Sequence, residues 1–411
     1  MDTIEARRVV AAVAAYRDSM VEFTKALVAI PTENPPGAVY PACVRAIANK
    51  LRDLGLDHTV LNVPPDPALA EDASDPYPRS CVIGSHGGGA RTLYFHGHYD
   101  VVPASVAGQF EPRVDGGRLF GRGSSDMKSG LAAMIHAVAA LRDAEISLDG
   151  RVGLVIVPDE ETGGRRGSRY LAEAGLLGRG GIGMLTAEPT GGVVWNANRG
   201  AITLRVTVKG KPAHVGLQHE GINAFEHMLV VAEALRDLKT EVEGRVSAFA
   251  LEPEIARHSI LMLGGRCEGG TNFNVVPAEC SFTVERRINP EEDLQAEKAR
   301  LFGVLDRLRD DGIDLAVEIL QEAPSSGSPD DSPLALALAD SIVAETGRAP
   351  AFELCPGLLE IRFYAQKGMP AYAYGPGLLS VSHGPGEFVE VDKIATCAAI
   401  YARTALRLLG A

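Results

Sequence analysis

The sequence predicts an α/β fold, in which a larger domain with a mostly parallel central sheet flanked by helices is interrupted by a smaller inserted α+β domain. Three observations predict this fold. Apolar, strand-like runs alternate with helical patterns between residues 92 and 186, as they do in α/β proteins. Acidic residues or histidines follow the ends of these runs. The pattern then changes near Trp195 to alternating apolar and polar residues, and a chain of 411 residues is long enough for two domains.

The first part of the larger domain, residues 1–197, is expected to begin with helices. Apolar residues recur at three- and four-residue intervals over 9–30, and Pro31 ends this pattern. A second helical pattern covers 40–54. The stretch 61–80 is rich in Pro, Asp and Ala and is predicted to be an exposed loop.

Three buried strands and a helix are expected next. The apolar runs 92–95, 151–157 and 183–186 predict strands, and 127–141 predicts a helix that follows a glycine-rich turn. The carboxyl ends of parallel strands meet at one edge of a sheet, and ligands bind there. The polar residues just past these strands are therefore expected to lie close together.

The inserted domain is expected to cover residues 198–322. Its alternating run 201–209 predicts a half-buried strand. The later elements are predicted in the order helix, strand, strand, helix, strand, over 224–238, 258–263, 278–287, 290–308 and 315–320. This order is typical of a split βαβ, or ferredoxin-like, sandwich.

The larger domain is expected to resume over residues 323–411. A segment rich in Pro, Ser, Gly and Asp, 323–333, predicts a hinge. A helical pattern over 332–346 and an apolar strand over 369–374 follow it.

Charge and cysteine content limit the partners and the compartment. The formal charge of −13 argues against binding to nucleic acid or to an anionic membrane, because those partners attract basic surfaces. No apolar stretch reaches the roughly 20 residues that a membrane-spanning helix needs, and residues 1–5 show no secretory signal. None of the six cysteines forms a C-x-x-C pair, so reduced thiols and a cytoplasmic location are expected.

Five places bring histidines or carboxylates to a strand end or a glycine-rich turn. Each place by itself is ordinary for a solvated loop, but the whole set predicts a metal site. The residues are His98 with Asp100, Asp126, Glu160 with Glu161, Glu188, and His383.

The residue types suit two divalent ions. Zinc and related ions take imidazole nitrogen and carboxylate oxygen at about 2.0–2.2 Å, and two ions about 3.5–4 Å apart need a bridging carboxylate. Asp126, a short acid on a tight turn, suits the bridge. Asp100 and His98 have their side chains on the same side of an extended segment. Asp100 is therefore suited to orient the His98 imidazole by a hydrogen bond.

Glu160 and Glu161 are adjacent, and adjacent extended residues point apart. One of them is expected to bind an ion while the other takes the proton of a metal-bound water as a general base. Such a water attacks a polarised carbonyl, so hydrolysis of an amide or a related bond is expected.

At this point the sequence resembles a known family, the dinuclear metallohydrolases that include acetylornithine deacetylase, succinyl-diaminopimelate desuccinylase, glutamate carboxypeptidase and the bacterial aminoacylases. The resemblance lies in five motifs in family order, spread over nearly the whole chain. They are GHYDVVP at 97–103, GRGSSDMKSG at 121–130, DEETG at 159–163, AEPT at 187–190 and SHGPGEF at 382–388.

The resemblance implies a role for each candidate residue. His98 and Glu188 would be end ligands of one ion, Glu161 and His383 would be end ligands of the other, and Asp126 would bridge them. Glu160 would be the general base and Asp100 the partner of His98. The ions would be zinc in the first place, with cobalt or manganese as alternatives. The larger domain would be catalytic, and residues 198–322 would form a lid that also makes a homodimer.

The resemblance also implies a substrate-binding set. His214 would reach the active site of the partner subunit and stabilise the oxyanion, while Arg287 and Asn272 would hold a substrate carboxylate or nearby groups. Arg199 would also contact substrate, and Gly375 would form a backbone wall beside it. Where many relatives have Thr/Ser-Asp-Ala-Arg, this chain has Leu-Glu-Ile-Arg at 359–362. Arg362 would face the site, although the hydroxyl of that motif is lost.

The expected activity is therefore the removal of an acyl group from an N-acyl amino acid or a similar small compound. An exopeptidase of the carboxypeptidase or dipeptidase type is the alternative, because the same metal chemistry serves both. A non-catalytic binding protein with the family fold is a remote alternative, since every expected ligand and Glu160 are present. A serine or cysteine nucleophile finds little support, because the chain has no G-x-S-x-G elbow.

Overall fold

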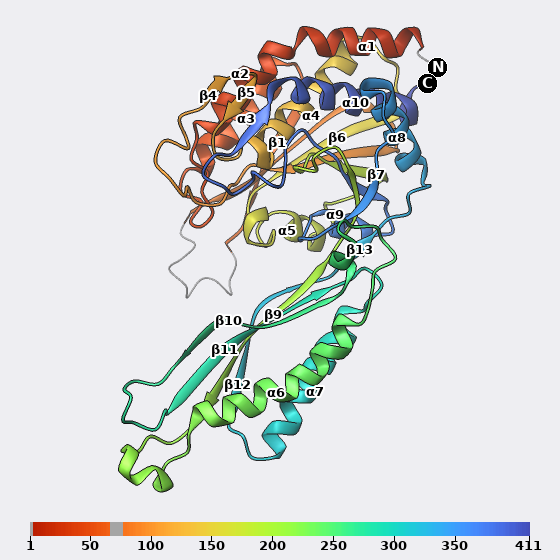
Figure 1. Ribbon diagram of the computed structural model, residues 1–411. Coiled ribbons are helices and arrows are strands. Elements are labelled where there is room, and N and C mark those ends of the chain that lie inside the picture. The colour runs from red at the N-terminus through yellow and green to blue at the C-terminus, as the bar shows by residue number, and fades with distance from the viewer. Residues whose placement is uncertain (1–2, 66–76) are drawn as a thin grey trace. The chain divides into compact units, whose positions relative to one another are not determined.

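The computed structural model describes residues 3–65 and 77–411, which form two compact units (Figure 1). The first unit comprises the described residues up to Asn196, together with Ser328–Glu353 and Glu360–Ala411. The second unit comprises Ala197–Gly327 and Leu354–Leu359. Among the described residues, no helix combines the length and the apolar character that a membrane crossing requires.

A nine-stranded sheet is the centre of the first unit. Its strands follow the order β1-β2-β6-β3-β7-β15-β8-β13, and β14 pairs with β8. The bounds are β1 Asp57–Val63, β2 Arg79–Gly88, β3 Thr92–His98, β6 Gly150–Val157, β7 Gly181–Thr186, β8 Val194–Asn198, β13 Ser326–Gly327, β14 Phe352–Cys355 and β15 Ala371–Ala373. A smaller sheet of order β16-β5-β4 comprises β4 Arg113–Asp115, β5 Arg118–Phe120 and β16 Phe388–Glu390.

The middle of the large sheet is parallel and its flanks are antiparallel. β3 lies between β6 and β7 and runs parallel to both, and β15 is parallel to β7. β2 pairs antiparallel with β6, and β8 pairs antiparallel with β15. The three central strands β6, β3 and β7 therefore end at the same edge, which confirms the predicted α/β fold and brings their following residues together.

Helices cover this sheet and supply most of its core. Their bounds are α1 Ile4–Ala15, α2 Arg17–Val28, α3 Tyr40–Asp53, α4 Ser129–Asp143, α5 Ser168–Glu173, α8 Pro333–Thr346, α9 Ile361–Ala365 and α10 Val391–Leu409. Every residue of α4 from Ser129 to Leu141 is buried, because the helix packs against both α10 and α2. Its sequence is apolar on all sides, as expected for a helix that is enclosed by its neighbours.

The single helix predicted over 9–30 is wrong, because the chain forms two helices there. α1 ends at Ala15 and α2 begins at Arg17, with Tyr16 in a non-helical conformation (φ −91°, ψ 2°). The phenol of Tyr16 lies 2.5 Å from Asp143 Oδ2, and both α1 and α2 pack against α4 and α10. The helical spacing of apolar residues continues through this break, so periodicity did not reveal it.

The loop predicted over 61–80 is wrong at both of its ends. β1 extends to Val63 and β2 begins at Arg79, and the two strands pair antiparallel. β1 is an edge strand with mostly exposed or half-exposed residues, so it lacks the apolar run that predicts a buried strand. The part of this prediction that covers 66–76 lies outside the described residues.

The second unit has the predicted β-α-β-β-α-β order. Its elements are β9 Gly200–Lys209, α6 Ala224–Glu243, β10 Ile260–Gly269, β11 Glu279–Ile288, α7 Leu294–Asp310 and β12 Leu315–Ala323. The sheet order β10-β11-β9-β12 is antiparallel throughout, as in ferredoxin-like sandwiches. Asn223 and Asp293 cap α6 and α7 with their side-chain oxygens.

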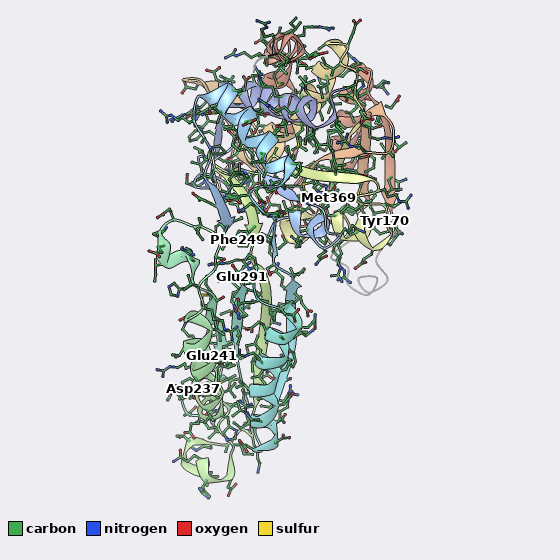
Figure 2. The ribbon with its side chains drawn as sticks, turned by 90° about the vertical axis from the view of Figure 1, so that its right-hand side faces the viewer. Tyr170, Asp237, Glu241, Phe249, Glu291 and Met369 are labelled. Atoms are coloured by element: carbon green, nitrogen blue, oxygen red, sulfur yellow. The ribbon has the colours of Figure 1, made fainter. Side chains whose placement is uncertain are left out.

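The two helices of the second unit also contact each other through polar side chains. Figure 2 labels Asp237 and Glu241 on α6, and Glu241 forms an ion pair with Arg300 of α7. The inward faces of the same helices bury apolar side chains such as Leu235 and Leu305 against the sheet. The unit therefore has a core of its own.

Candidate metal centre

The candidate ligands occupy loops that follow the parallel strands, as the sequence predicts. His98 is the last residue of β3, Glu188 lies two residues past β7, and Glu161 lies in a short 3-10 turn after β6. Asp126 comes from the turn before α4, where its backbone leaves helical geometry (φ −123°, ψ 99°). His383 comes from a loop near the end of the chain and has a left-handed backbone (φ 63°). All five residues belong to the first unit.

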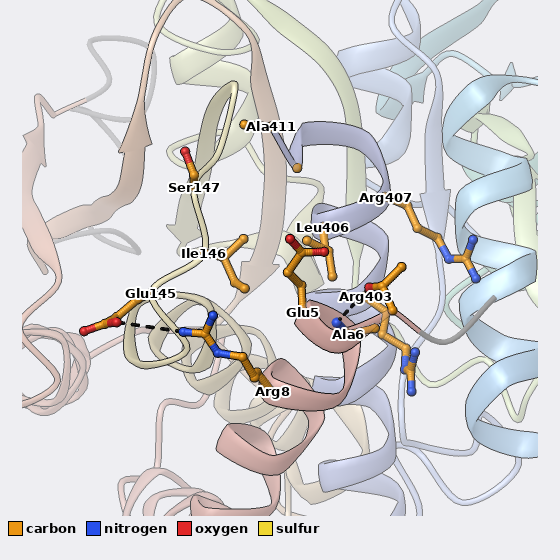
Figure 3. A pocket seen from close by; sticks show the side chains of 12 residues that line it. Glu5, Ala6, Arg8, Glu145, Ile146, Ser147, Arg403, Leu406, Arg407 and Ala411 are labelled. Atoms are coloured by element: carbon orange, nitrogen blue, oxygen red, sulfur yellow. Dashed lines mark hydrogen bonds and ion pairs between the residues drawn. The ribbon is translucent and has the colours of Figure 1, made fainter.

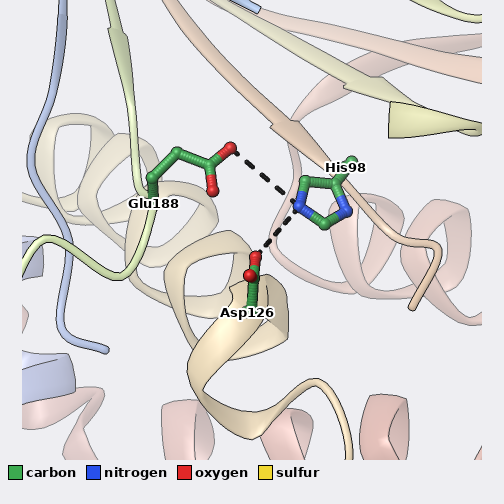
Figure 4. Close-up of side chains that lie close together, drawn as sticks. All are labelled: His98, Asp126 and Glu188. Atoms are coloured by element: carbon green, nitrogen blue, oxygen red, sulfur yellow. Dashed lines mark hydrogen bonds and ion pairs between the residues drawn. The ribbon is translucent and has the colours of Figure 1, made fainter. Parts of the chain in front are cut away.

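The first group of candidate ligands comprises His98, Asp126 and Glu188 (Figure 4). His98 Nε2 lies 3.2 Å from Asp126 Oδ1 and 3.9 Å from Glu188 Oε1. The three residues are 1%, 9% and 5% exposed, respectively. This group, which we call the sealed group, therefore has little access to solvent.

The second group comprises Asp126, Glu161 and His383. His383 Nε2 lies 3.2 Å from Glu161 Oε2 and 3.4 Å from Asp126 Oδ2. The His383 side chain is 49% exposed, whereas that of Glu161 is 7% exposed. We call this set the open group, because one of its members reaches solvent.

Asp126 belongs to both groups and turns one oxygen to each histidine. In each group the candidate ligand atoms lie within 4.8 Å of one another. Glu161 Oε1 is buried and has no hydrogen-bond partner among the described residues, and a buried carboxylate oxygen of this kind is costly unless something else binds it. The donors present, imidazole nitrogen and carboxylate oxygen around one shared carboxylate, therefore fit two divalent ions.

Asp100 connects His98 to the loop that carries the two glutamates. Its Oδ1 lies 3.4 Å from His98 Nδ1 and accepts the Glu160 N–H at 3.2 Å. Its Oδ2 accepts the Glu161 N–H at 3.1 Å and the side-chain amide of Asn34 at 2.9 Å. With its proton on Nδ1, His98 presents the free electron pair of Nε2 to the sealed group.

The loop before Glu160 is fixed by a buried ion pair. Asp159 has a left-handed backbone (φ 65°), and its carboxylate accepts the Arg79 Nε–H at 2.9 Å and the Tyr40 hydroxyl at 3.1 Å. Sequence reasoning missed Asn34, Arg79 and Tyr40. No spacing rule connects them to the motifs, because they lie far from their partners along the chain.

The electrostatics of the site depend on burial and on the close packing of carboxylates and imidazoles. Burial, with added repulsion from neighbouring carboxylates, raises the pKa of Glu160 well above its ordinary value and that of Glu188 to about 8. Although burial opposes it, hydrogen bonds from His383 and His98 hold the pKa of Asp126 below its ordinary range. Hydrogen bonds to Asp126 and Glu161 raise the pKa of His383 to about 10. The metal-free site therefore retains protons that a cation has to displace.

Two further predicted residues lie in the first unit. Arg362 is 2% exposed and donates to the Gly163 carbonyl at 3.1 Å, so it contacts the loop of the two glutamates. Gly375 donates its N–H to Thr190 Oγ1 at 3.2 Å. A Cβ at Gly375 would lie 2.2 Å from the Ala187 carbonyl oxygen, so only glycine fits there.

Four predicted residues lie in the second unit. His214 and Asn272 are exposed, and Arg287 forms an ion pair with Glu285 at 2.6 Å. Arg199 is 2% exposed and donates to Asn289 Oδ1 at 3.1 Å and to the His258 carbonyl at 2.8 Å. Arg199 therefore holds loops of its own unit together. Contact of any of these four residues with substrate remains a prediction.

A cavity of about 340 Å³ lies between the two ends of the chain, away from the candidate ligands (Figure 3). Several of its charged lining residues form ion pairs. Arg8 lies 3.8 Å from Glu145, Arg403 pairs with Glu345, and Arg407 lies 3.1 Å from Asp340.

Comparisons with known proteins agree with this geometry. The model of peptidase family M20/M25/M40 matches residues 94–407. The chain is 30% identical over 382 residues to the succinyl-diaminopimelate desuccinylase of Nitrosomonas eutropha, covering 89% of this chain and 93% of that protein. It is 28% identical over 333 residues to the acetylornithine deacetylase of Myxococcus xanthus, covering 80% and 83%.

Solved structures show the same fold. Human carnosine dipeptidase 1 superposes with a TM-score of 0.74 at 17% identity, covering 99% of both chains. The metallo-carboxypeptidase Sso-CP2 from Sulfolobus solfataricus superposes with a TM-score of 0.75 at 16% identity, covering 95% of this chain and 98% of that one.

Proposed function

Because the chain belongs to peptidase family M20/M25/M40, which confirms the resemblance seen in the motifs, we propose that it removes the acyl group from an N-acyl amino acid or a similar small N-acyl compound. Its family makes it a hydrolase of amides or peptides. The finer proposal rests on curated relatives that are named for desuccinylation and deacetylation. The observation that supports metal-dependent hydrolysis is Asp126, whose two oxygens face two different histidines.

We propose that the sealed and open groups hold two divalent ions, with zinc as the first choice and cobalt or manganese as alternatives. His98 and Glu188 would hold one ion, Glu161 and His383 the other, and Asp126 would contact both. When bound, such ions supply Lewis-acid polarisation of a carbonyl and an acidified water. The donor set supports two ions, whereas the choice of metal depends on availability and geometry.

Glu160 is proposed as the general base. Its neighbour Glu161 belongs to the open group, while Asp100 holds the backbone amides of both residues. A half-buried carboxyl with a raised pKa is suited to take a proton from water and pass it to the leaving amine. Asp100 would keep His98 in the tautomer that binds an ion.

The substrate contacts are proposed from the resemblance. His214, from a partner subunit, would donate to the developing oxyanion. Arg287 and Asn272 would bind a carboxylate or nearby groups, with Arg199, Arg362 and Gly375 as further contacts. A homodimer formed through the second unit follows from the role of His214. We also propose a cytoplasmic location, because none of the six cysteines forms a C-x-x-C pair.

An exopeptidase of the dipeptidase or carboxypeptidase type is the second candidate function. Structures of this fold include proteins named as a dipeptidase and a carboxypeptidase. The same ligands and Glu160 would serve either reaction, so the pocket for the acyl or peptide group decides between them.

A substrate panel on metal-reconstituted enzyme tests the proposal. N-acetyl, N-succinyl and N-formyl amino acids are compared with dipeptides, and we expect the highest kcat/KM among the N-acyl compounds. Glu160→Gln should lower kcat by about 10²–10⁴-fold with the metal content unchanged, whereas Glu111→Gln at an exposed carboxylate should leave both unchanged. Preference for dipeptides would establish the second candidate function instead. An enzyme that binds no divalent ion would support the non-catalytic alternative.

A further inference from the structure

We propose that Arg122 and Glu387 form a positioning pair that holds the shared ligand Asp126 and the open-group ligand His383 as one unit before any metal binds. This inference rests on the proposed function, because it concerns how the two-ion site is assembled. Both residues lie within motifs of the sequence, but their types and spacing suggested no role for them.

Glu387 holds the turn that carries Asp126. Its Oε1 accepts the backbone N–H groups of Gly123 at 2.9 Å, Ser125 at 3.0 Å and Asp126 at 3.2 Å. Three amides converge on one oxygen because Gly123 has a left-handed backbone (φ 82°) and Asp126 leaves helical geometry. Successive amides in such a turn form a concave site for an anion, and here the anion is a side chain of the same protein.

Arg122 holds the loop that carries His383. Its Nη1 donates to Glu387 Oε2 at 2.6 Å, and its Nη2 donates to the His383 carbonyl at 3.0 Å. Nη1 also lies 3.4 Å from the Gly384 carbonyl. The planar guanidinium can reach these acceptors together, which a lysine ammonium cannot do with the same geometry.

The Arg122–Glu387 pair is buried and acts mainly on the open group. Arg122 is 1% exposed and Glu387 is 2% exposed, so water does not compete for these hydrogen bonds. Through it, residues 122–126 and 383–387 are tied together across more than half of the chain. In the sealed group the Arg122–Glu387 pair holds the backbone of Asp126 only. In the open group the pair holds the backbones of both Asp126 and His383. Its loss should therefore weaken the open group more than the sealed group.

The test measures binding of Zn²⁺ alone to the metal-free full-length protein, against a competing chelator, for wild type, Arg122→Lys and Glu387→Gln. We expect the affinity for one of the two ions to fall by about 10–100-fold in both variants, the size typical for partners that orient metal ligands. The affected ion should be the one that His383→Ala also weakens. Glu345→Gln is the matched control, because Glu345 pairs with the largely buried Arg403 in the same unit and contacts no candidate ligand.

Hydrogen exchange of the wild-type protein gives a readout that needs no variant. In the metal-free protein, peptides over 121–128 should exchange slowly, because Glu387 accepts their amides before any ion is bound. Fast exchange there would overturn the inference. So would unchanged affinity for both ions in Arg122→Lys and Glu387→Gln, or an equal loss in Glu345→Gln. A wild-type protein that binds no Zn²⁺ would overturn the proposed function as well, so the two failures are distinguishable.

Discussion

The sealed and open groups use the same kinds of ligand and share Asp126, but they are built in different ways. His98 and Glu188 of the sealed group come directly from the ends of neighbouring strands, and both are buried. In the open group, His383 comes from a distant loop, has a left-handed backbone and is 49% exposed. The sheet therefore places two of the three sealed-group residues directly, whereas the open group depends on a distant loop for His383. His383 is also the member of the two groups that is half exposed to solvent.

The largest effect is expected at the ligand that the two groups share. Asp126→Asn replaces the carboxylate that faces both histidines with a neutral amide, so both ions should bind weakly. We expect a loss of turnover on the order of 10³-fold or more, comparable to removing a central catalytic group. Metal analysis and kcat check this, with Asp115→Asn at an exposed carboxylate as the control. Retention of two ions at wild-type affinity would show that Asp126 is a ligand of neither ion.

Loss of His98 should destabilise the metal-free protein more than loss of His383. Burial opposes the charged form of His98, yet hydrogen bonds to Asp100 and Asp126 raise its pKa above the ordinary value, so these buried carboxylates favour the protonated imidazole in the metal-free protein. His98→Ala leaves these carboxylates uncompensated and should lower the free energy of unfolding by about 3 kcal/mol.

His383→Ala should cost less than about 1 kcal/mol, because the His383 side chain is 49% exposed and solvent screens its ion pairs. Urea unfolding of the two metal-free variants gives the comparison. Equal losses would contradict the distinction between a sealed and an open group.

The pH dependence of metal binding sharpens the comparison at the open group. Hydrogen bonds to Asp126 and Glu161 raise the pKa of His383 to about 10, and the ordinary value is about 6.5. Since the folded pKa is the higher one, this pairing stabilises the metal-free fold fully below pH of about 6.5 and is lost as the pH rises towards 10.

A cation must displace the His383 proton, so affinity for the open-group ion should change in the opposite direction. It should rise by up to about tenfold per pH unit over this range. Chelator-buffered titrations at several pH values measure the slope for wild type and His383→Ala. The dependence of affinity on pH should be shallower in the variant. Identical slopes would show that the His383 proton is not displaced when the ion binds.

The smallest effect is expected at Asp100, the partner of His98, because Asp100 accepts hydrogen bonds from several donors. Asn34→Ala removes the hydrogen bonds of its amide to Asp100 and Thr162, but Asp100 still accepts the amides of Glu160 and Glu161. We expect a loss of about 1 kcal/mol in stability and less than about a tenfold change in kcat. Thermal unfolding and steady-state kinetics check this. A loss as large as that of His98→Ala would show that Asn34 positions His98 on its own.

The fold and the candidate ligands were predictable where a local sequence pattern also determines the position of a residue in the fold. The strands that carry His98 and Glu188 are short apolar runs, and polar residues past such runs meet at one sheet edge. Asp126 lies on a turn whose glycines permit left-handed backbone. The second unit was predictable because its strands and helices keep regular periods.

Features that depend on tertiary contacts were not predictable. The helix break at Tyr16 leaves the apolar spacing intact, so only packing reveals it. β1 is an edge strand without an apolar run. Glu387 and Arg79 act through side chains that meet partners far away in sequence, and no local rule encodes such a meeting. Arg199 follows a family motif, yet its contacts lie within its own unit.

The position of His383 near the end of the chain has a consequence for biosynthesis. About 200 residues, including the whole second unit, separate Glu188 from His383. At a translation rate of roughly 5–20 residues per second, that delay is on the order of tens of seconds. During this interval the nascent polypeptide already contains four of the five candidate ligands, but the open group still lacks His383. An ion proposed for the open group could therefore contact all of its candidate ligands only after His383 has been synthesised.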